Sequence, residues 1–415
     1  MSKKSEVITF GCRLNIYESE IIMQDLKKNV VTNTSVFNSC AVTSESVKQI
    51  KREIRKKRKE SPNRKIVVTG CAAQIEPETF QRMPEVDQVI GNIEKRHIHS
   101  NLEKNNRVEV QDIMSLNNSL NSLKKGYSDR TRAFVEIQNG CNHRCTFCII
   151  PYGRGNLRSK KSKSITKEIK TLIVEGHKEI ILTGVDIASW GQDFEKEGKL
   201  GELVKDILKE LPKLERLRLS TMDVIGFDNI LIENITQNDR ILPHIHLSLQ
   251  SGDNMILKRM KRRHSREEAI NLCNRLKKVR PEISFGADLI VGFPTESEEM
   301  FQNTLKIVDE CRLDWIHVFP FSPRPGTPAA KMPQIDISVI RERARILRSK
   351  AHNKKKTHLA GLVGHKKEVF IEKNNKGYTN QFAPIKLLEN KLDYGKSINA
   401  LIIDADDDFG YAIRV

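Results

Sequence analysis

The stretch Gly140-Cys141-Asn142-His143-Arg144-Cys145-Thr146-Phe147-Cys148 places three thiols on one short segment, in the pattern C-x3-C-x2-C. Thiolates are soft ligands that suit iron–sulfur clusters or zinc. Three ligands would leave one position of a 4Fe–4S cluster open. Structural zinc takes four ligands, but catalytic zinc also takes three, so spacing alone favours a cluster and leaves zinc open. The bacterial ferredoxin run is C-x2-C-x2-C, so ordinary electron transfer fits poorly.

The residues around these thiols resemble the signature of the radical S-adenosylmethionine (SAM) superfamily, which has an aromatic residue before the last cysteine, here Phe147. The resemblance implies that Cys141, Cys145 and Cys148 hold a 4Fe–4S cluster and that SAM binds its open iron, with Phe147 beside the cofactor. One electron from the reduced cluster would then cleave SAM to methionine and a 5′-deoxyadenosyl radical.

Length and composition fit a soluble protein of two or three domains with a polyanionic partner. The chain has 415 residues, 38% of them hydrophobic, and a net charge of +18, which indicates nucleic acid as a partner. Eight cysteines without an apolar signal segment favour metal-binding or catalytic thiols in a reducing cytoplasm. No apolar run is long enough to span a membrane, so we expect no membrane partner.

Alternating strand and helix patterns predict a parallel α/β domain in residues 1–115. Strand-like apolar runs lie at 6–10, 36–37, 66–69 and 86–90, and a helical pattern follows the first of them. An Asn/Ser/Leu/Lys-rich segment at 115–126 is typical of a linker.

Residues 127–356 predict a partial (β/α)6 barrel. Helical stretches such as 165–175 and 201–211 separate six strand candidates, at 133–138, 179–184, 215–220, 244–249, 284–290 and 315–321. Sites in such barrels lie at the C-terminal ends of strands, and the cysteine segment directly follows the first strand. Beyond it, β-like runs at 366–372, 382–388 and 399–403 predict a small β-barrel in residues 357–415.

Three further cysteines, Cys12, Cys40 and Cys71, each follow a predicted strand of the N-terminal domain. Because the carboxyl ends of parallel strands share one edge of a sheet, we expect these cysteines to converge. Three separately buried thiols are the alternative, since free cysteine is often buried. The small residues that precede them favour convergence, because they would leave room for a bulky cluster: Gly11, Ser39 and Gly70.

The segments 11–15 (GCRLN), 38–43 (NSCAVT) and 70–74 (GCAAQ) resemble the three cysteine motifs of the methylthiotransferases, and the resemblance covers nearly the whole chain. It implies that Cys12, Cys40 and Cys71 hold a second 4Fe–4S cluster, and that a TRAM domain follows the radical-SAM domain. In this family one SAM methylates a sulfur on the second cluster, and another SAM supplies the radical for methylthio transfer. Cys273 and Cys311 match no motif and are expected to pack between helices.

Three branches of this family compete: one acts on isopentenyladenosine in tRNA, one on threonylcarbamoyladenosine in tRNA, and one on an aspartate of ribosomal protein S12. Four segments resemble the threonylcarbamoyladenosine (t6A) branch, namely 149–155, 182–186, 244–252 and 317–327. The resemblance implies methylthiolation of C2 of t6A at position 37 of tRNA, with a reductant such as flavodoxin or ferredoxin. A basic enzyme also suits RNA better than a basic ribosomal protein.

Polar residues and glycines at the predicted strand ends are candidate SAM contacts, although strand-end caps and turns are an equal alternative for each. They are Thr183, Gly184, Ser220, Gln250 and Gly292.

Basic runs at 48–65, 258–263 and 341–356 indicate an RNA surface, although a single run is more often a solvated helix face. In the C-terminal domain, aromatic residues would contact RNA by stacking, with a packing module as the alternative. The candidate RNA contacts are Arg55, Lys56, Arg262, Arg263, Tyr378 and Phe382. A zinc-dependent RNA enzyme or a non-catalytic RNA-binding protein would explain the charge, but not two cysteine triads together with Phe147.

Overall fold

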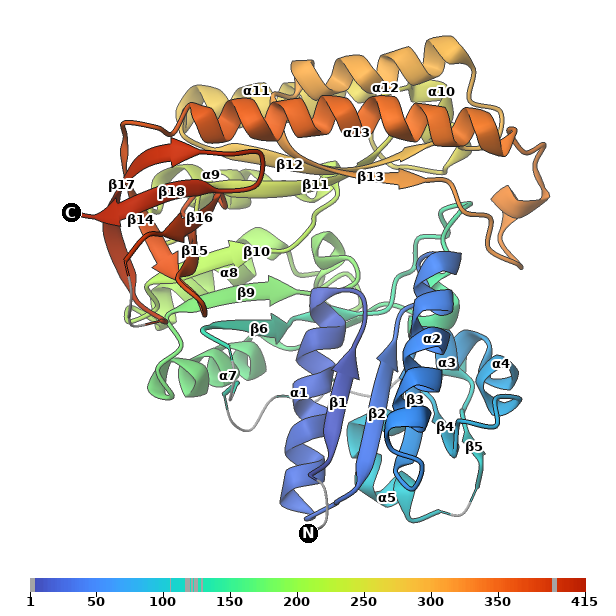
Figure 1. Cartoon of the computed structure of the whole chain (residues 1–415). Coiled ribbons are helices and arrows are strands. Elements are labelled where there is room, and N and C mark those ends of the chain that lie inside the picture. Colours follow the sequence, from blue (N-terminus) through green and yellow to red (C-terminus); the bar gives the residue numbers. More distant parts are fainter. Residues whose placement is uncertain are drawn as a thin grey trace.

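The computed structural model describes residues 4–104, 106–115, 120, 122, 126–127, 130–389 and 394–415, so most of the predicted linker lies outside the described residues. Figure 1 shows three parts: a blue N-terminal sheet with helices, a green-to-orange central sheet with helices, and a red C-terminal barrel. The predicted fold class is therefore confirmed. None of the helices in the described part of the chain has the length and apolarity needed to cross a membrane.

The N-terminal part is a parallel sheet with the strand order β1-β2-β3-β4-β5. Buried β-branched residues fill its central strands, as in Ile66-Val67-Val68-Thr69 of β3. The strands are β1 (Glu6–Thr9), β2 (Thr34–Ser39), β3 (Lys65–Gly70), β4 (Gln88–Ile90) and β5 (Val108–Glu109), of which β5 was not predicted. The helices are α1 (Arg13–Lys28), α2 (Ser44–Glu60), α3 (Cys71–Ile75), α4 (Pro77–Gln81) and α5 (Ile98–Leu102).

The central part is a curved sheet of six parallel strands, which confirms the predicted partial barrel. Strands β6-β9-β10 and β11-β12-β13 form two halves, and the isolated bridges Leu217–Ile241 and Met222–Leu247 join them. The bounds lie within two residues of those predicted: β6 (Arg132–Glu136), β9 (Glu179–Thr183), β10 (Arg216–Leu219), β11 (His244–Gln250), β12 (Ser284–Val291) and β13 (Leu313–Pro320). A short hairpin, β7 (Gln138–Asn139) with β8 (Arg158–Ser159), brackets the cysteine segment.

Amphipathic helices cover the central sheet. In α8, for example, the buried residues Leu200, Leu203, Val204 and Ile207 follow the spacing of one helix face. The helices are α6 (Ile150–Arg154), α7 (Ser162–Val174), α8 (Leu200–Glu210), α9 (Asn229–Gln237), α10 (Asn254–Arg259), α11 (Arg266–Val279), α12 (Glu298–Glu310) and α13 (Ile337–Ala360). Leu14 and Tyr17 of α1 belong to the same hydrophobic core, so the N-terminal part is packed directly against the central one.

The C-terminal part is a closed five-stranded barrel in the order β14-β15-β16-β18-β17. Its strands are β14 (Lys366–Ile371), β15 (Lys376–Thr379), β16 (Pro384–Leu387), β17 (Ser397–Ala405) and β18 (Gly410–Arg414). Arg216 Nη1 contacts Glu368 Oε1 at 3.1 Å, and Ser284 Oγ donates to the Gln381 carbonyl at 2.7 Å. Because Arg216 and Ser284 begin β10 and β12, the barrel packs at the N-terminal ends of the central strands (Figure 1). The Cys141–Cys148 segment instead follows the C-terminal end of β6.

A buried carboxylate, Glu179, organises the arginines at this interface. Arg216 Nε and Arg218 Nε donate to its two oxygens at 2.9 and 2.8 Å, and Arg218 Nη2 also donates to the Thr379 carbonyl of β15 at 3.1 Å. Burial alone would raise the pKa of Glu179, but the guanidinium groups of Arg218, Arg216 and Arg132 hold it below its ordinary value. The carboxylate is therefore charged in the folded protein at neutral pH.

The substitution Glu179→Gln is expected to destabilise the protein by about 3–5 kcal/mol, because it leaves a buried cluster of arginines without its counter-charge. The folded pKa lies below the unfolded one, so this stabilisation is present above the unfolded value of about 4.3 and is lost as the pH falls further. Urea unfolding at neutral pH and at about pH 3 should show the difference between wild type and variant shrinking in acid. An equal difference at both pH values would contradict this account. Glu215→Gln, which removes an exposed partner of Lys178, is the matched control.

Candidate functional site

The Cys141–Cys148 segment lies at the C-terminal edge of the central sheet, as predicted from its place after the first strand. Burial, together with Asp186, Cys148 and Cys145, raises the pKa of the Cys141 thiol to about 12. Burial also raises the pKa of Cys148 to about 11, with a further increase from Cys145. The Cys148 backbone N–H donates to the Cys145 carbonyl at 3.0 Å, so the chain turns tightly between these two cysteines. Metal binding would have to displace their protons.

Cys12, Cys40 and Cys71 converge in the same way at the C-terminal edge of the N-terminal sheet. Burial raises the pKa of Cys40 to about 11, and the Cys71 and Cys12 thiols raise it further. Cys12 is exposed, whereas the other two are buried. Gly11 has a left-handed φ of +89°, and a Cβ there would lie 2.8 Å from Cys40 Sγ. Glycine at this position therefore leaves space beside the thiols.

The thiols of neither described triad lie close enough together to bind one zinc ion. With a Zn–S bond of about 2.3 Å, two sulfurs on one zinc ion lie at most about 4.6 Å apart. Among the described residues, only His246, Asp288 and His317 bring three possible ligand atoms within 4.8 Å of one another, so neither cysteine triad does. Two sets of three soft ligands with wider spacing suit iron–sulfur clusters better than zinc.

The predicted SAM contacts lie near the C-terminal edge of the central sheet, and each has its own surroundings. Ser220 Oγ is buried and has no hydrogen-bond partner among the described residues, as expected of a group that meets a ligand. Thr183 is buried at the end of β9. Gln250 ends β11 with a left-handed φ of +68°. Phe147 packs beside Met260 and its neighbours.

The two predicted glycines are closely surrounded by protein. A Cβ at Gly184 would lie 2.7 Å from the Gln138 carbonyl oxygen. Gly292 has a φ of +73°, and a Cβ there would meet the Ile340 side chain of α13 at 2.5 Å. Close packing is thus sufficient to explain why both positions are glycine, and their contact with SAM stays a prediction.

Two of the predicted RNA contacts point into the site. Arg262 Nη1 lies 3.7 Å from Cys145 Sγ, and Nη2 donates to Asp223 Oδ2 at 3.0 Å. Arg263 Nη2 pairs with Asp223 at 3.1 Å and with Asp186 at 3.4 Å. Although burial raises the pKa of Asp223, His264 and these arginines hold it well below its ordinary value. The basic run marked this segment in the sequence, but nothing marked Asp223.

The other predicted RNA contacts fall into two groups. Arg55 and Lys56 are exposed on α2, where they can meet a phosphate backbone. Tyr378 and Phe382 stack on each other at 4.7 Å, and Phe382 also stacks on His244 of β11 at 5.0 Å. These two rings thus lie between the C-terminal barrel and the central sheet, and their contact with RNA stays a prediction.

Arg13 follows Cys12 in the chain, and its side chain extends toward the C-terminal barrel. Its guanidinium lies 5.8 Å from the centre of the Phe382 ring. Burial lowers the pKa of Arg13 and Arg132 lowers it further, whereas Glu179 and Asp288 raise it. Among the residues that the structure describes, none forms a hydrogen bond or ion pair with this half-buried side chain. It is therefore placed to pair with an anionic ligand.

Asp288 lies in the same interior, between two histidines. His246 Nε2 and His317 Nδ1 each lie 3.0 Å from Asp288 Oδ1. Burial would raise the pKa of Asp288, but its bonds to both histidines hold it well below its ordinary value. Its charge is thus already paired on both sides, in contrast to that of Arg13.

The chain matches two family models and is similar to several named proteins. Residues 135–308 match the family model of the Radical SAM superfamily, and residues 4–91 match that of the uncharacterized protein family UPF0004. The chain is 45% identical to the threonylcarbamoyladenosine tRNA methylthiotransferase MtaB of Rickettsia prowazekii, over 99% of this chain and 98% of that protein. It is 32% identical to the tRNA-2-methylthio-N(6)-dimethylallyladenosine synthase of Ehrlichia canis, over 92% and 96%.

Among solved structures, the chain is similar to the radical S-adenosylmethionine methyltransferase TsrM of Kitasatospora setae. The TM-score is 0.56 with 13% identity, over 78% of this chain and 77% of that one. This likeness shows the fold alone. The superfamily match implies SAM and a 4Fe–4S cluster as cofactors.

Proposed function

Because the chain belongs to the radical SAM methylthiotransferase family, we propose that it transfers a methylthio group to C2 of t6A at position 37 of tRNA. Cys141, Cys145 and Cys148 would hold the cluster that binds SAM, and Cys12, Cys40 and Cys71 a second cluster. When bound, SAM and the two clusters supply the radical and the sulfur that reaction at an unactivated carbon requires. The transfer uses two SAM molecules, as the family resemblance implies.

The proposal rests on one observation: residues that follow Cys148 contact Cys71 of the second triad and its hydrophobic core. Six residues after Cys148, the side chain of Arg154 reaches Cys71, with Nε 3.0 Å from Sγ. Ile149, next to Cys148, is buried in the N-terminal hydrophobic core together with Cys71. The segment after the SAM-binding loop therefore also forms one wall of the second site, which is what a reaction that uses both sites needs.

Arg13 supports t6A as the substrate rather than isopentenyladenosine. The threonyl group of t6A carries a carboxylate, whereas the isopentenyl group is a hydrocarbon. The Arg13 guanidinium has no ionic partner among the described residues, so it suits the carboxylate. A hydrocarbon would remove water from it and offer no hydrogen bond in exchange. The basic charge of +18 favours RNA over a ribosomal protein as the larger partner. We also propose that the enzyme works in the cytoplasm, with flavodoxin or ferredoxin as electron donor.

Anaerobic purification and nucleoside analysis test the proposal together. The loaded enzyme is expected to contain about eight irons per chain, four in each cluster. With SAM and reductant, it should methylthiolate tRNA that carries t6A and leave tRNA that carries isopentenyladenosine unchanged. Mass spectrometry of the digested tRNA reads both products. Modification of the isopentenyl form alone would assign the chain to the sister branch, and zinc without iron would contradict radical chemistry.

A further inference from the structure

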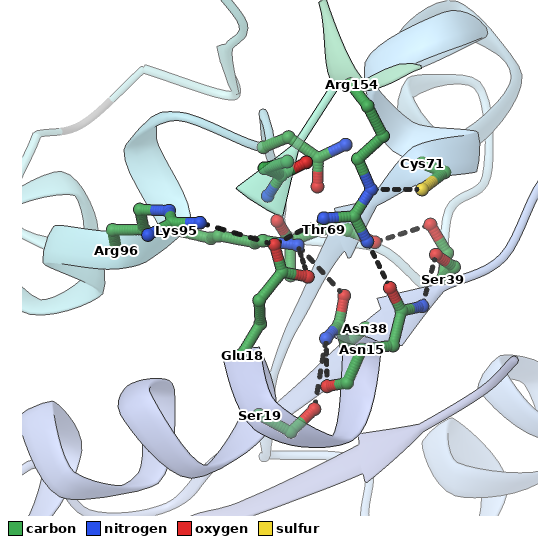
Figure 2. Close-up of polar contacts among 12 residues, drawn as sticks. Asn15, Glu18, Ser19, Asn38, Ser39, Thr69, Cys71, Lys95, Arg96 and Arg154 are labelled. Carbon is green, nitrogen blue, oxygen red and sulfur yellow. Dashed lines mark hydrogen bonds and ion pairs between the residues drawn. The ribbon is translucent and has the colours of Figure 1, made fainter. Parts of the chain in front are cut away.

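A buried network of polar and charged side chains lies beside Cys71, with Arg154 at its centre (Figure 2). Arg154 is only 2% exposed. Its Nη1 donates to Glu18 and its Nη2 to Asn15, both on α1, while its Nε faces Cys71 Sγ at 3.0 Å. Each guanidinium nitrogen thus has a separate partner, so the orientation of Arg154 toward the sulfur is fixed.

The cations of this network outnumber its carboxylates. Lys95 Nζ pairs with Glu18 at 2.6 Å, and Arg96 Nη2 pairs with Glu136 at 2.7 Å. With Arg154 and with Arg158, whose Nη2 donates to the Arg154 carbonyl at 2.9 Å, four cations therefore face two carboxylates. A buried unpaired cation is strongly unfavourable. Three thiolates, or a cluster that they hold, would supply the missing negative charge next to Arg154.

Arg154 also comes from a different part of the chain than the sulfur it contacts. It ends α6, which follows the SAM-binding loop, whereas Cys71 follows β3 of the N-terminal sheet. The N-terminal part alone therefore lacks the guanidinium that faces Cys71 Sγ. Hydrogen bonds to cluster sulfurs and nearby positive charge raise the reduction potential of iron–sulfur clusters.

We propose that Arg154 is a positioning residue of the second cluster: it donates a hydrogen bond to the Cys71 thiolate, completes the site from the central domain, and raises the reduction potential of that cluster. This inference rests on the proposed function only in requiring a cluster at Cys12, Cys40 and Cys71. It differs from a structural role, because an arginine that merely joined two domains would not change a redox potential.

The test uses the full chain with Cys141, Cys145 and Cys148 replaced by Ala, so that only the second cluster is observed. Arg154→Lys and Arg154→Gln are compared with Arg96→Gln, which removes the same charge from the same network without touching a sulfur. Redox titration followed by electron paramagnetic resonance is expected to show a tenfold lower ratio of reduced to oxidised cluster at fixed potential in the Arg154 variants. This equals a shift of about 59 mV to more negative potential. The shift in Arg96→Gln should be smaller.

The other outcomes also decide the matter. An unchanged potential in Arg154 variants that keep four irons would overturn the proposal, and so would a shift in Arg96→Gln as large as theirs. Loss of the four irons from Arg154 variants that remain folded by circular dichroism supports it, provided that Arg96→Gln keeps its irons. Loss of folded structure in both Arg154 variants would assign a structural role and overturn it. A parent chain without a second cluster would instead contradict the proposed function.

Discussion

Replacement of Cys12, Cys40 or Cys71 by Ala is expected to abolish methylthiolation while SAM cleavage continues. Each change removes one of three ligands from the second site but leaves the Cys141–Cys148 segment intact. We expect product formation to fall by more than about 1000-fold, which corresponds to about 4 kcal/mol of lost transition-state stabilisation. Release of 5′-deoxyadenosine from SAM should stay within about threefold of wild type, a difference below about 1 kcal/mol.

Chromatography of the SAM products and mass spectrometry of the tRNA nucleosides measure the two activities in one reaction. Cys141→Ala is the converse variant and should lose both activities. Cys273→Ala is the matched control, because Cys273 is a buried free thiol of α11 in the central hydrophobic core. It should keep both activities. Loss of SAM cleavage in all three N-terminal variants, with the SAM-binding cluster still loaded, would contradict the division of roles between the triads.

The sequence was sufficient to predict the strands whose residues pack into a hydrophobic core. Most strands of the central sheet have apolar runs, and in β10 (Arg216–Leu219) leucines alternate with arginines; each of the six was found within two residues of its bounds. In the C-terminal barrel, β15 and β18 were missed because each is short and contains a glycine, Gly377 or Gly410. Barrel closure pairs these segments with their neighbours, and no local pattern reveals that pairing.

The two triads were predictable for a related reason, since each cysteine lies next to a recognisable strand or loop. The buried network beside Cys71 could not be predicted, and it includes Arg154, Glu18 and Lys95. Glu18 and Lys95 are far apart in the sequence, and a charged residue within a helical pattern normally indicates a solvated face. Their burial follows from the packing of α1 between the N-terminal and central parts, which only the structure shows.

The substitution Arg13→Gln is expected to lower kcat/KM for tRNA that carries t6A by about 30-fold or more. Loss of one charged partner from a buried carboxylate pair costs at least about 2 kcal/mol. Arg13→Lys should recover part of this loss, because lysine keeps the charge but not the two-pronged geometry of the guanidinium. Kinetics with the purified tRNA, followed by nucleoside mass spectrometry, give the values, and the iron content of each variant shows that both clusters remain.

A second substrate separates recognition of the carboxylate from general binding of RNA. On the same tRNA with the threonyl carboxylate converted to an amide, wild type and Arg13→Gln should have similar kcat/KM, since the ionic pair is absent from both. Arg55→Gln, on the exposed face of α2, is the control for phosphate contacts. It should weaken both substrates equally and reduce the salt dependence of binding. If Arg13→Gln lowered kcat/KM equally for both substrates, Arg13 would act on the RNA backbone or the second cluster, and the argument for t6A from this residue would fail.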